Sequence, residues 1–66
     1  MNRLQFWRKE RGLSQSELAK KSGVSVRLIQ AYEQGLKDIN KGQVVTVLEL
    51  AEALEVDVYA IINDRV

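Results

Sequence analysis

The sequence predicts an all-α fold, a bundle of five short helices. One pattern occurs four times: an apolar residue, a capping residue, three further residues and a second apolar residue. In this pattern the capping oxygen can accept from free N–H groups of the first helical turn, and the two apolar residues can form a hydrophobic staple. Gly12, Gly23 and Gly35 each follow a helical stretch, where a left-handed residue readily ends a helix. No segment shows the sustained alternation that predicts a strand.

The repeated pattern and the glycines together define the helix boundaries. The four starts are Leu13, Ser14 and Leu18; Val24, Ser25 and Ile29; Ile39, Asn40 and Val44; and Val56, Asp57 and Ile61. Ser14 with Glu17 also matches a capping box, and Asn40 with Gln43 is a close variant. We therefore predict helices over residues 2–11, 15–22, 26–34, 41–54 and 58–63.

A period of 3.6 residues gives each predicted helix an apolar face. The helix over 41–54 is apolar on more than half of its circumference, so we expect it at the centre of the bundle. Phe6 falls outside the stripe of its helix and is expected to be half exposed or part of a partner surface. The predicted core comprises Leu4, Trp7, Leu18, Ala19, Leu28, Ile29, Tyr32, Val44, Val47, Leu48, Ala51, Leu54, Val58, Ile61 and Ile62, with Leu50 beside them.

Length and composition exclude several classes of protein. A chain of 66 residues holds one domain at most, residues 1–66, with a marginal core. The absence of Cys and His excludes disulfides and leaves only scattered carboxylates as metal ligands, so we expect no metal and no other cofactor. Apolar runs are far shorter than the roughly 20 residues of a membrane-spanning helix. No apolar stretch follows the basic residue near the start, so no signal peptide is predicted and a cytoplasmic protein is expected.

The sequence also argues against an enzyme. Glu49, Glu52 and Glu55 are three residues apart along the fourth predicted helix, a spacing typical of a solvated face rather than of a catalytic carboxylate pair. No glycine-rich phosphate loop and no nucleophile with a neighbouring base is present. We therefore expect no catalysis. Since 66 residues leave no room for a separate ligand domain, we also expect no small-molecule ligand.

The charges are distributed unevenly along the chain. Residues 1–41 hold nine basic and four acidic side chains, whereas residues 42–66 hold one basic and five acidic side chains. This asymmetry suggests that the first part of the chain meets a polyanion and that the acidic part faces away from it.

The second and third predicted helices are joined by three residues only, as in a helix-turn-helix unit. Ala19 is small where the third helix must approach, Gly23 can adopt the left-handed conformation, and Val24 can hold the turn inward. The stretches GLSQSELAKKSGVSVRLIQAYEQG (12–35) and INKGQVVTVLELAEALEV (39–56) resemble the Cro and phage-repressor (XRE) helix-turn-helix family.

This resemblance implies a fold and a function. The fold is the five-helix bundle of phage-repressor DNA-binding domains, with the helix-turn-helix at residues 15–34 and the third helix in the major groove. The function is sequence-specific binding of double-stranded DNA by a transcriptional regulator, with a repressor expected.

The outward face of the third predicted helix holds the candidate base contacts Ser25, Val26, Arg27, Gln30 and Ala31. Arg27 can bond both acceptors of a guanine, Gln30 a base or a phosphate, and Val26 and Ala31 a thymine methyl group. By resemblance, positions 25, 26, 27 and 31 make the base contacts. Val26 and Ala31 are apolar where the family often has polar residues, which favours a larger contribution from Arg27 and from DNA shape.

Candidate phosphate contacts surround this helix. Gln15 lies at the start of the second helix, where free N–H groups favour an anion, and the family uses this glutamine for the DNA backbone. Ser14 caps the same helix and could share the contact. The resemblance extends the set to Gln34, Lys37 and Lys41 and implies a structural ion pair between Arg8 and Glu33.

Further hypotheses concern the oligomeric state and the alternatives to a regulator. A regulator with one recognition helix per chain normally binds as a dimer, and Val45 and Ile62 could supply a homodimer seam. The alternative to a regulator is a protein-interaction module, such as an antitoxin or an adaptor. An antitoxin usually carries an additional toxin-binding segment, and few residues follow the last predicted helix. The third hypothesis for the function is a purely structural helical fragment.

Overall fold

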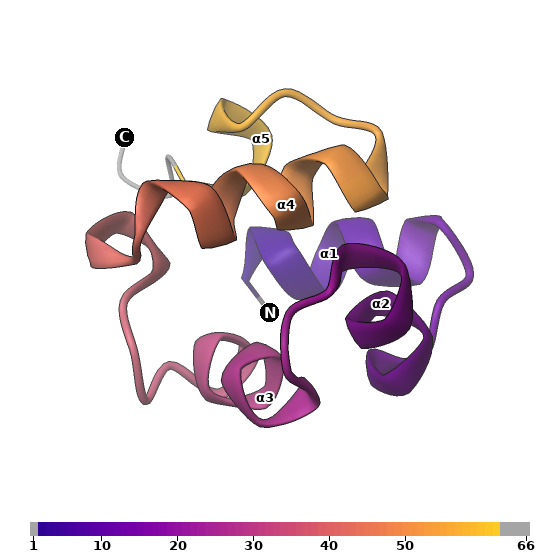
Figure 1. Ribbon diagram of the computed structural model, residues 1–66, viewed down its shortest axis with the longest axis horizontal. Helices are drawn as coiled ribbons and strands as arrows, with labels where there is room; N and C mark the ends of the chain where they lie inside the picture. The colour runs from indigo at the N-terminus through magenta and orange to yellow at the C-terminus, as the bar shows by residue number, and fades with distance from the viewer. Residues whose placement is uncertain (1, 63–66) are drawn as a thin grey trace.

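The computed structural model describes residues 2–62, a range in which every regular element is a helix and no strand occurs (Figure 1). Within this range the helices are α1 (Arg3–Glu10), α2 (Gln15–Ser22), α3 (Val26–Gln34), α4 (Val44–Leu54) and α5 (Tyr59–Ile62), with a 3₁₀ turn η1 (Ile39–Lys41) before α4. The all-α class is confirmed, and α2 and α3 have the predicted bounds. No helix in the described part of the chain is long and apolar enough to cross a membrane.

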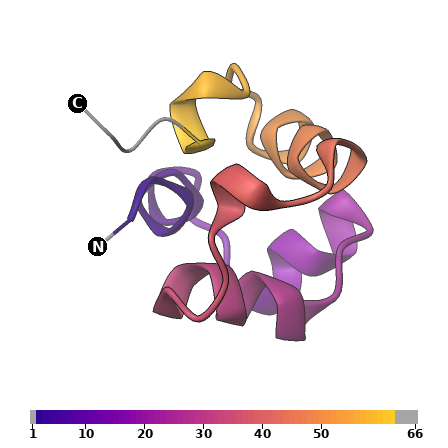
Figure 2. The same ribbon diagram turned by 90° about the vertical axis from the view of Figure 1, so that its left-hand side faces the viewer.

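The helices form two halves that meet at a shared core. α2 packs against both α3 and α4, and α1 packs against α3 and α5. In Figure 2, α1 lies between α5 at the top and α3 at the bottom. α3 is thus on the opposite side of the molecule from α5.

Every α-helix of the described range contributes to the core. The fully buried side chains are Leu4, Leu18, Ile29, Leu50, Leu54 and Ile61. Each contributes about 1.5–3 kcal/mol through removal of its apolar surface from water. Several residues predicted to be in the core are only partly buried at its edge, namely Trp7, Ala19, Leu28, Val58 and Ile62.

The first half of the chain has well-capped helices. Ser14 Oγ accepts from the Glu17 backbone N–H at 3.0 Å, and Glu17 Oε1 accepts from the Ser14 N–H at 2.7 Å, which forms the predicted capping box. The hydrogen bonds from the Ser14 backbone and hydroxyl lower the pKa of Glu17. The first helix is one residue shorter at each end than predicted, since Arg11 follows α1 and Asn2 precedes it. Asn2 caps the helix by accepting from the Gln5 N–H at 2.9 Å.

The predicted start of the fourth helix is wrong by three residues. Asn40 is not its cap and forms no capping box with Gln43. Instead, Asp38 caps the η1 turn by accepting from the Asn40 N–H at 2.9 Å, and Gln43 precedes α4 without a side-chain capping bond. Gly42 is extended between the two helices and lies so close to the Tyr32 ring that a Cβ atom would be 2.5 Å from Tyr32 Oη. The separate turn lets Ile39 enter the core before the chain passes this ring.

Two predicted core residues of α4 are exposed. Val44 and Leu48 have relative exposures of 72% and 50%, whereas Val47, Leu50, Ala51 and Leu54 are buried as expected, together with Ala53. α4 is apolar around most of its circumference, but other helices pack against one side of it only. The face that carries Val44 and Leu48 therefore remains in solvent. α5 begins at Tyr59, one residue later than predicted. Asn63, the predicted last residue of this helix, lies outside the described residues.

Candidate nucleic-acid interface

The turn between α2 and α3 is formed by Gly23, Val24 and Ser25. Gly23 has φ +80°, a left-handed conformation that favours glycine, and its N–H bonds the Ala19 carbonyl. The Val24 side chain is buried, and Ser25 Oγ caps α3 by accepting from the Leu28 N–H at 3.1 Å. The turn therefore holds α3 at a fixed angle to α2.

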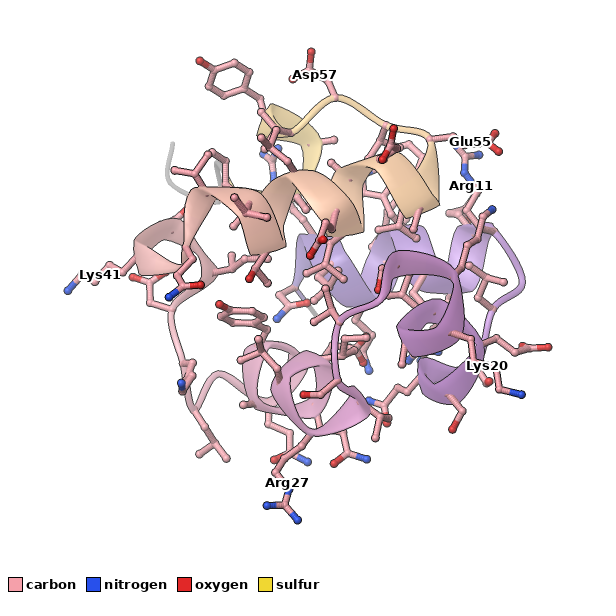
Figure 3. The ribbon with its side chains drawn as sticks, in the orientation of Figure 1. Arg11, Lys20, Arg27, Lys41, Glu55 and Asp57 are labelled. Atoms are coloured by element: carbon pink, nitrogen blue, oxygen red, sulfur yellow. The ribbon has the colours of Figure 1, made fainter. Side chains whose placement is uncertain are left out.

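α3 has one buried face and one exposed face. Ile29 and Tyr32 are buried, whereas Ser25, Arg27 and Gln30 are exposed. The Arg27 side chain points away from the body of the molecule (Figure 3). The candidate base contacts Val26 and Ala31 lie on α3 with them and are partly buried. The first turn of α3 can thus approach a groove without rearrangement of the bundle.

The Arg8 and Glu33 side chains form a bidentate ion pair between α1 and α3. Arg8 Nε donates to Glu33 Oε2 at 2.7 Å, and Arg8 NH2 donates to Glu33 Oε1 at 3.0 Å. The two side chains are 10% and 2% exposed. Arg8 NH1 donates to the Leu13 carbonyl at 2.8 Å, so the guanidinium also holds the loop that leads into α2. This pair joins three segments around the helix-turn-helix.

The ion pair is hydrogen-bonded to a chain of two glutamines, which the sequence predicts only as two separate contacts to DNA. Gln15 Nε2 donates to Glu33 Oε1 at 3.0 Å, and Gln30 Nε2 donates to Gln15 Oε1 at 3.3 Å. We call Arg8, Glu33, Gln15 and Gln30 the glutamine relay. Sequence patterns give no indication of this relay, because it depends on the crossing of α2 and α3.

The remaining candidate phosphate contacts are exposed polar side chains near α3. Ser14 precedes α2, Gln34 ends α3, and Lys37 lies in the loop that follows. Lys37 and Lys41 line a cleft of about 430 Å³ between α3 and the start of α4. Lys37 also borders a hollow of about 330 Å³ beside Arg27 and Ala31. Lys37 thus lies beside α3 and next to Arg27, whereas Lys41 lies near the start of α4. The acidic Asp38 lines the same cleft as the two lysines.

Acidic side chains occupy the far side of the molecule. In Figure 3, Glu55 and Asp57 lie at the top, beyond α4, whereas Arg27 is at the bottom. Arg11 lies beside Glu55, and its Nε donates to the Leu54 carbonyl at 2.7 Å. A polyanion that approached α3 from the side of Arg27 would therefore meet this guanidinium on the side of the molecule opposite to Glu55 and Asp57.

A three-residue turn with a left-handed glycine, a buried inner face and an exposed outer face on the second helix defines a helix-turn-helix domain of the DNA-binding class. The helix-turn-helix family model matches residues 4–61. The chain therefore belongs to the Cro/C1-type helix-turn-helix family, also known as the XRE family, whose members are DNA-binding transcription regulators. Neither the curated proteins nor the solved structures show a significant match to this chain.

Proposed function

We propose that the protein is a sequence-specific regulator of transcription that binds double-stranded DNA, and that α3 (Val26–Gln34) enters the major groove. The observation that carries this proposal is the exposure of Ser25, Arg27 and Gln30 at the start of α3, while Ile29 and Tyr32 anchor the same helix in the core. Helix-turn-helix proteins contact base edges with the first turns of this helix.

Four of the candidate base contacts have a defined task in this proposal. The Arg27 guanidinium donates to the O6 and N7 atoms of a guanine. Val26 and Ala31 contact thymine methyl groups, and the Ser25 hydroxyl, whose oxygen already caps α3, donates to a base or phosphate oxygen. Since two of these contacts are apolar, sequence-dependent DNA shape contributes to specificity.

The contacts to the DNA backbone come from the residues that flank α3. Ser14 and Gln15 contact one phosphate at the start of α2, and Gln34, Lys37 and Lys41 contact the backbone on the other side. Such contacts orient the protein on the duplex and carry no sequence information. They also make the affinity strongly dependent on salt.

The regulator binds as a homodimer in this proposal. One α3 helix contacts few base pairs, and two helices would contact half-sites about 34–36 Å apart, or a multiple of one helical turn. α4 and α5 expose the apolar side chains of Val44, Val45, Leu48 and Tyr59. Together with Ile62, these residues are the candidate dimer interface. A bundle that occupies an operator excludes other proteins from it, and we expect repression, in the cytoplasm, on this ground.

Selection of bound sequences from a random duplex pool tests this proposal. We expect an enriched motif that contains a guanine and, for a dimer, an inverted repeat. The binding constant should fall steeply with salt. Lys37→Ala should lower this salt dependence, whereas Lys20→Ala removes an equal charge on the solvated face of α2 and is the matched control. Enrichment of no motif, with equal affinity for all duplexes at low salt, would exclude sequence-specific regulation.

A further inference from the structure

The glutamine relay runs from the interior of the bundle to the exposed face of α3. We infer that the relay orients the Gln30 amide so that its carbonyl oxygen is offered to the DNA, and that Gln30 therefore selects adenine. The inference rests on the proposed function, because it assigns the base class that one residue of the proposed interface recognises.

The buried end of the relay determines the direction of every hydrogen bond in it. An ionised carboxylate can only accept hydrogen bonds. Glu33 therefore requires that Gln15 turn its NH₂ group toward it, as it does at 3.0 Å. The Gln15 oxygen then faces α3, and Gln30 must use its own NH₂ group to reach it, as it does at 3.3 Å. Reversal of either amide would place like atoms together.

The carboxylate at this end is held in place. Glu33 is bound at both oxygens by Arg8, and its side chain is only 2% exposed. Arg8 is held in turn by the Leu13 carbonyl. The outer end of the relay is different, because Gln30 is exposed. A polarity set in the interior is thus carried by two amides to a side chain that can meet DNA.

In this orientation one amide hydrogen of Gln30 bonds Gln15, and its carbonyl oxygen and second amide hydrogen remain available to bond a base. In the major groove adenine offers a donor at N6 beside an acceptor at N7, which matches this pair of atoms. Cytosine offers the N4 donor alone, and guanine and thymine offer acceptors toward the same position. Gln30 and Arg27 would therefore select different bases, adenine and guanine.

The Glu33→Gln variant tests the polarity directly. An amide at this position can donate as well as accept, so the Gln15 and Gln30 amides are free to reverse. In selections from a random duplex pool, we expect the wild type to prefer adenine at one position by roughly tenfold, within the range for one good base contact. The variant should lose most of this preference, while the guanine assigned to Arg27 stays enriched.

A second variant isolates the link between the glutamines, since Glu33→Gln also weakens a buried ion pair. Gln15→Met keeps Arg8 and Glu33 together and removes the hydrogen bonds of Gln15 to Glu33 and to Gln30, together with its proposed phosphate contact. The same loss of adenine preference is expected, measured as a ratio between bases so that a uniform loss of affinity has no effect. Gln5→Met, an identical chemical change in α1, is the matched control and should keep the wild-type preference.

The outcomes separate the inference from the proposed function. An unchanged adenine preference in both relay variants would overturn the inference, although the protein would still be a sequence-specific regulator. A wild type that binds no duplex would overturn both. The relay is also measurable without DNA, because Gln15→Met should shift the side-chain NH₂ signals of Gln30 in a ¹⁵N–¹H NMR spectrum. Signals that stay in place would show that the relay does not form.

Discussion

The α2–α3 corner, which comprises the two helices and their connecting turn (residues 15–34), differs from the α4–α5 half of the molecule in how its helices are capped and in what it exposes. The corner has side-chain caps on both of its helices, left-handed glycines at both helix ends, and a polar outer face. α4 has no side-chain cap, ends on a left-handed Glu55, and exposes Val44, Val45 and Leu48. The corner is therefore complete without a partner, whereas the α4–α5 half retains apolar surface that a partner could cover.

The largest expected effect concerns the buried pair that supports the corner. Arg8→Met would strand Glu33 without its partner and break the bond to the Leu13 carbonyl. Loss of one member of a buried ion pair costs about 3–5 kcal/mol. We expect the free energy of unfolding, measured by urea denaturation followed by circular dichroism, to fall by this amount.

Lys9→Met is the matched control for Arg8→Met, since it removes the same charge from an exposed neighbour on α1. It should change the stability by less than about 0.5 kcal/mol. A similar small loss for Arg8→Met would mean that the corner does not depend on the ion pair.

The second comparison is between two leucines of α4. Leu50 is fully buried and Leu48 is 50% exposed. Leu50→Ala should cost about 2–5 kcal/mol of stability through the lost burial and the cavity, and Leu48→Ala should cost less than about 1 kcal/mol in the monomer. If the two losses were equal, the buried face of α4 would be assigned incorrectly.

These leucines also show why the two halves differ in how far they could be predicted. At the corner, Ser14, Ser25 and Gly23 each satisfy a local requirement, so the bounds of α2 and α3 follow from sequence alone. In α4, apolar residues occupy most of the circumference, so periodicity cannot distinguish Leu48 from Leu50. The left-handed Glu55 carries no sequence signature either, because it is not a glycine or an asparagine.

The candidate site divides in the same way. The exposure of Ser25, Arg27 and Gln30 follows from the period of α3, which also buries Ile29. The contact between Gln15 and Gln30 does not follow from any period. It depends on the angle between two helices, and it joins residues 15 positions apart.

The third prediction concerns the outer face of the corner. Arg27→Ala should reduce discrimination at one base pair by about 1–3 kcal/mol, because the proposed bidentate contact to guanine would be lost. The fold should be unaffected, because the Arg27 side chain extends into solvent. Competition binding with single-base operator variants measures the change. A uniform loss across all base pairs would assign Arg27 to the phosphate backbone instead.

The smallest effects concern the helix ends, where the two halves should respond in opposite directions. Gly23 and Glu55 have φ values of +80° and +59°. A left-handed conformation costs a residue with a Cβ atom roughly 1–2 kcal/mol. Gly23→Ala should therefore destabilise the protein by about 1 kcal/mol, although the added Cβ would meet no atom within 4 Å. Glu55→Gly should stabilise it by about 0.5–1 kcal/mol.

The Glu55 substitution has one competing term, its contact with Lys21 at 3.8 Å. Both side chains are exposed, so this pair contributes little, and Lys21→Met measures its contribution separately. Thermal unfolding resolves differences of this size in a small domain. If Glu55→Gly were destabilising and Lys21→Met neutral, the end of α4 would be stabilised by the glutamate itself. The bond from Arg11 to the Leu54 carbonyl would then be the next contact to remove.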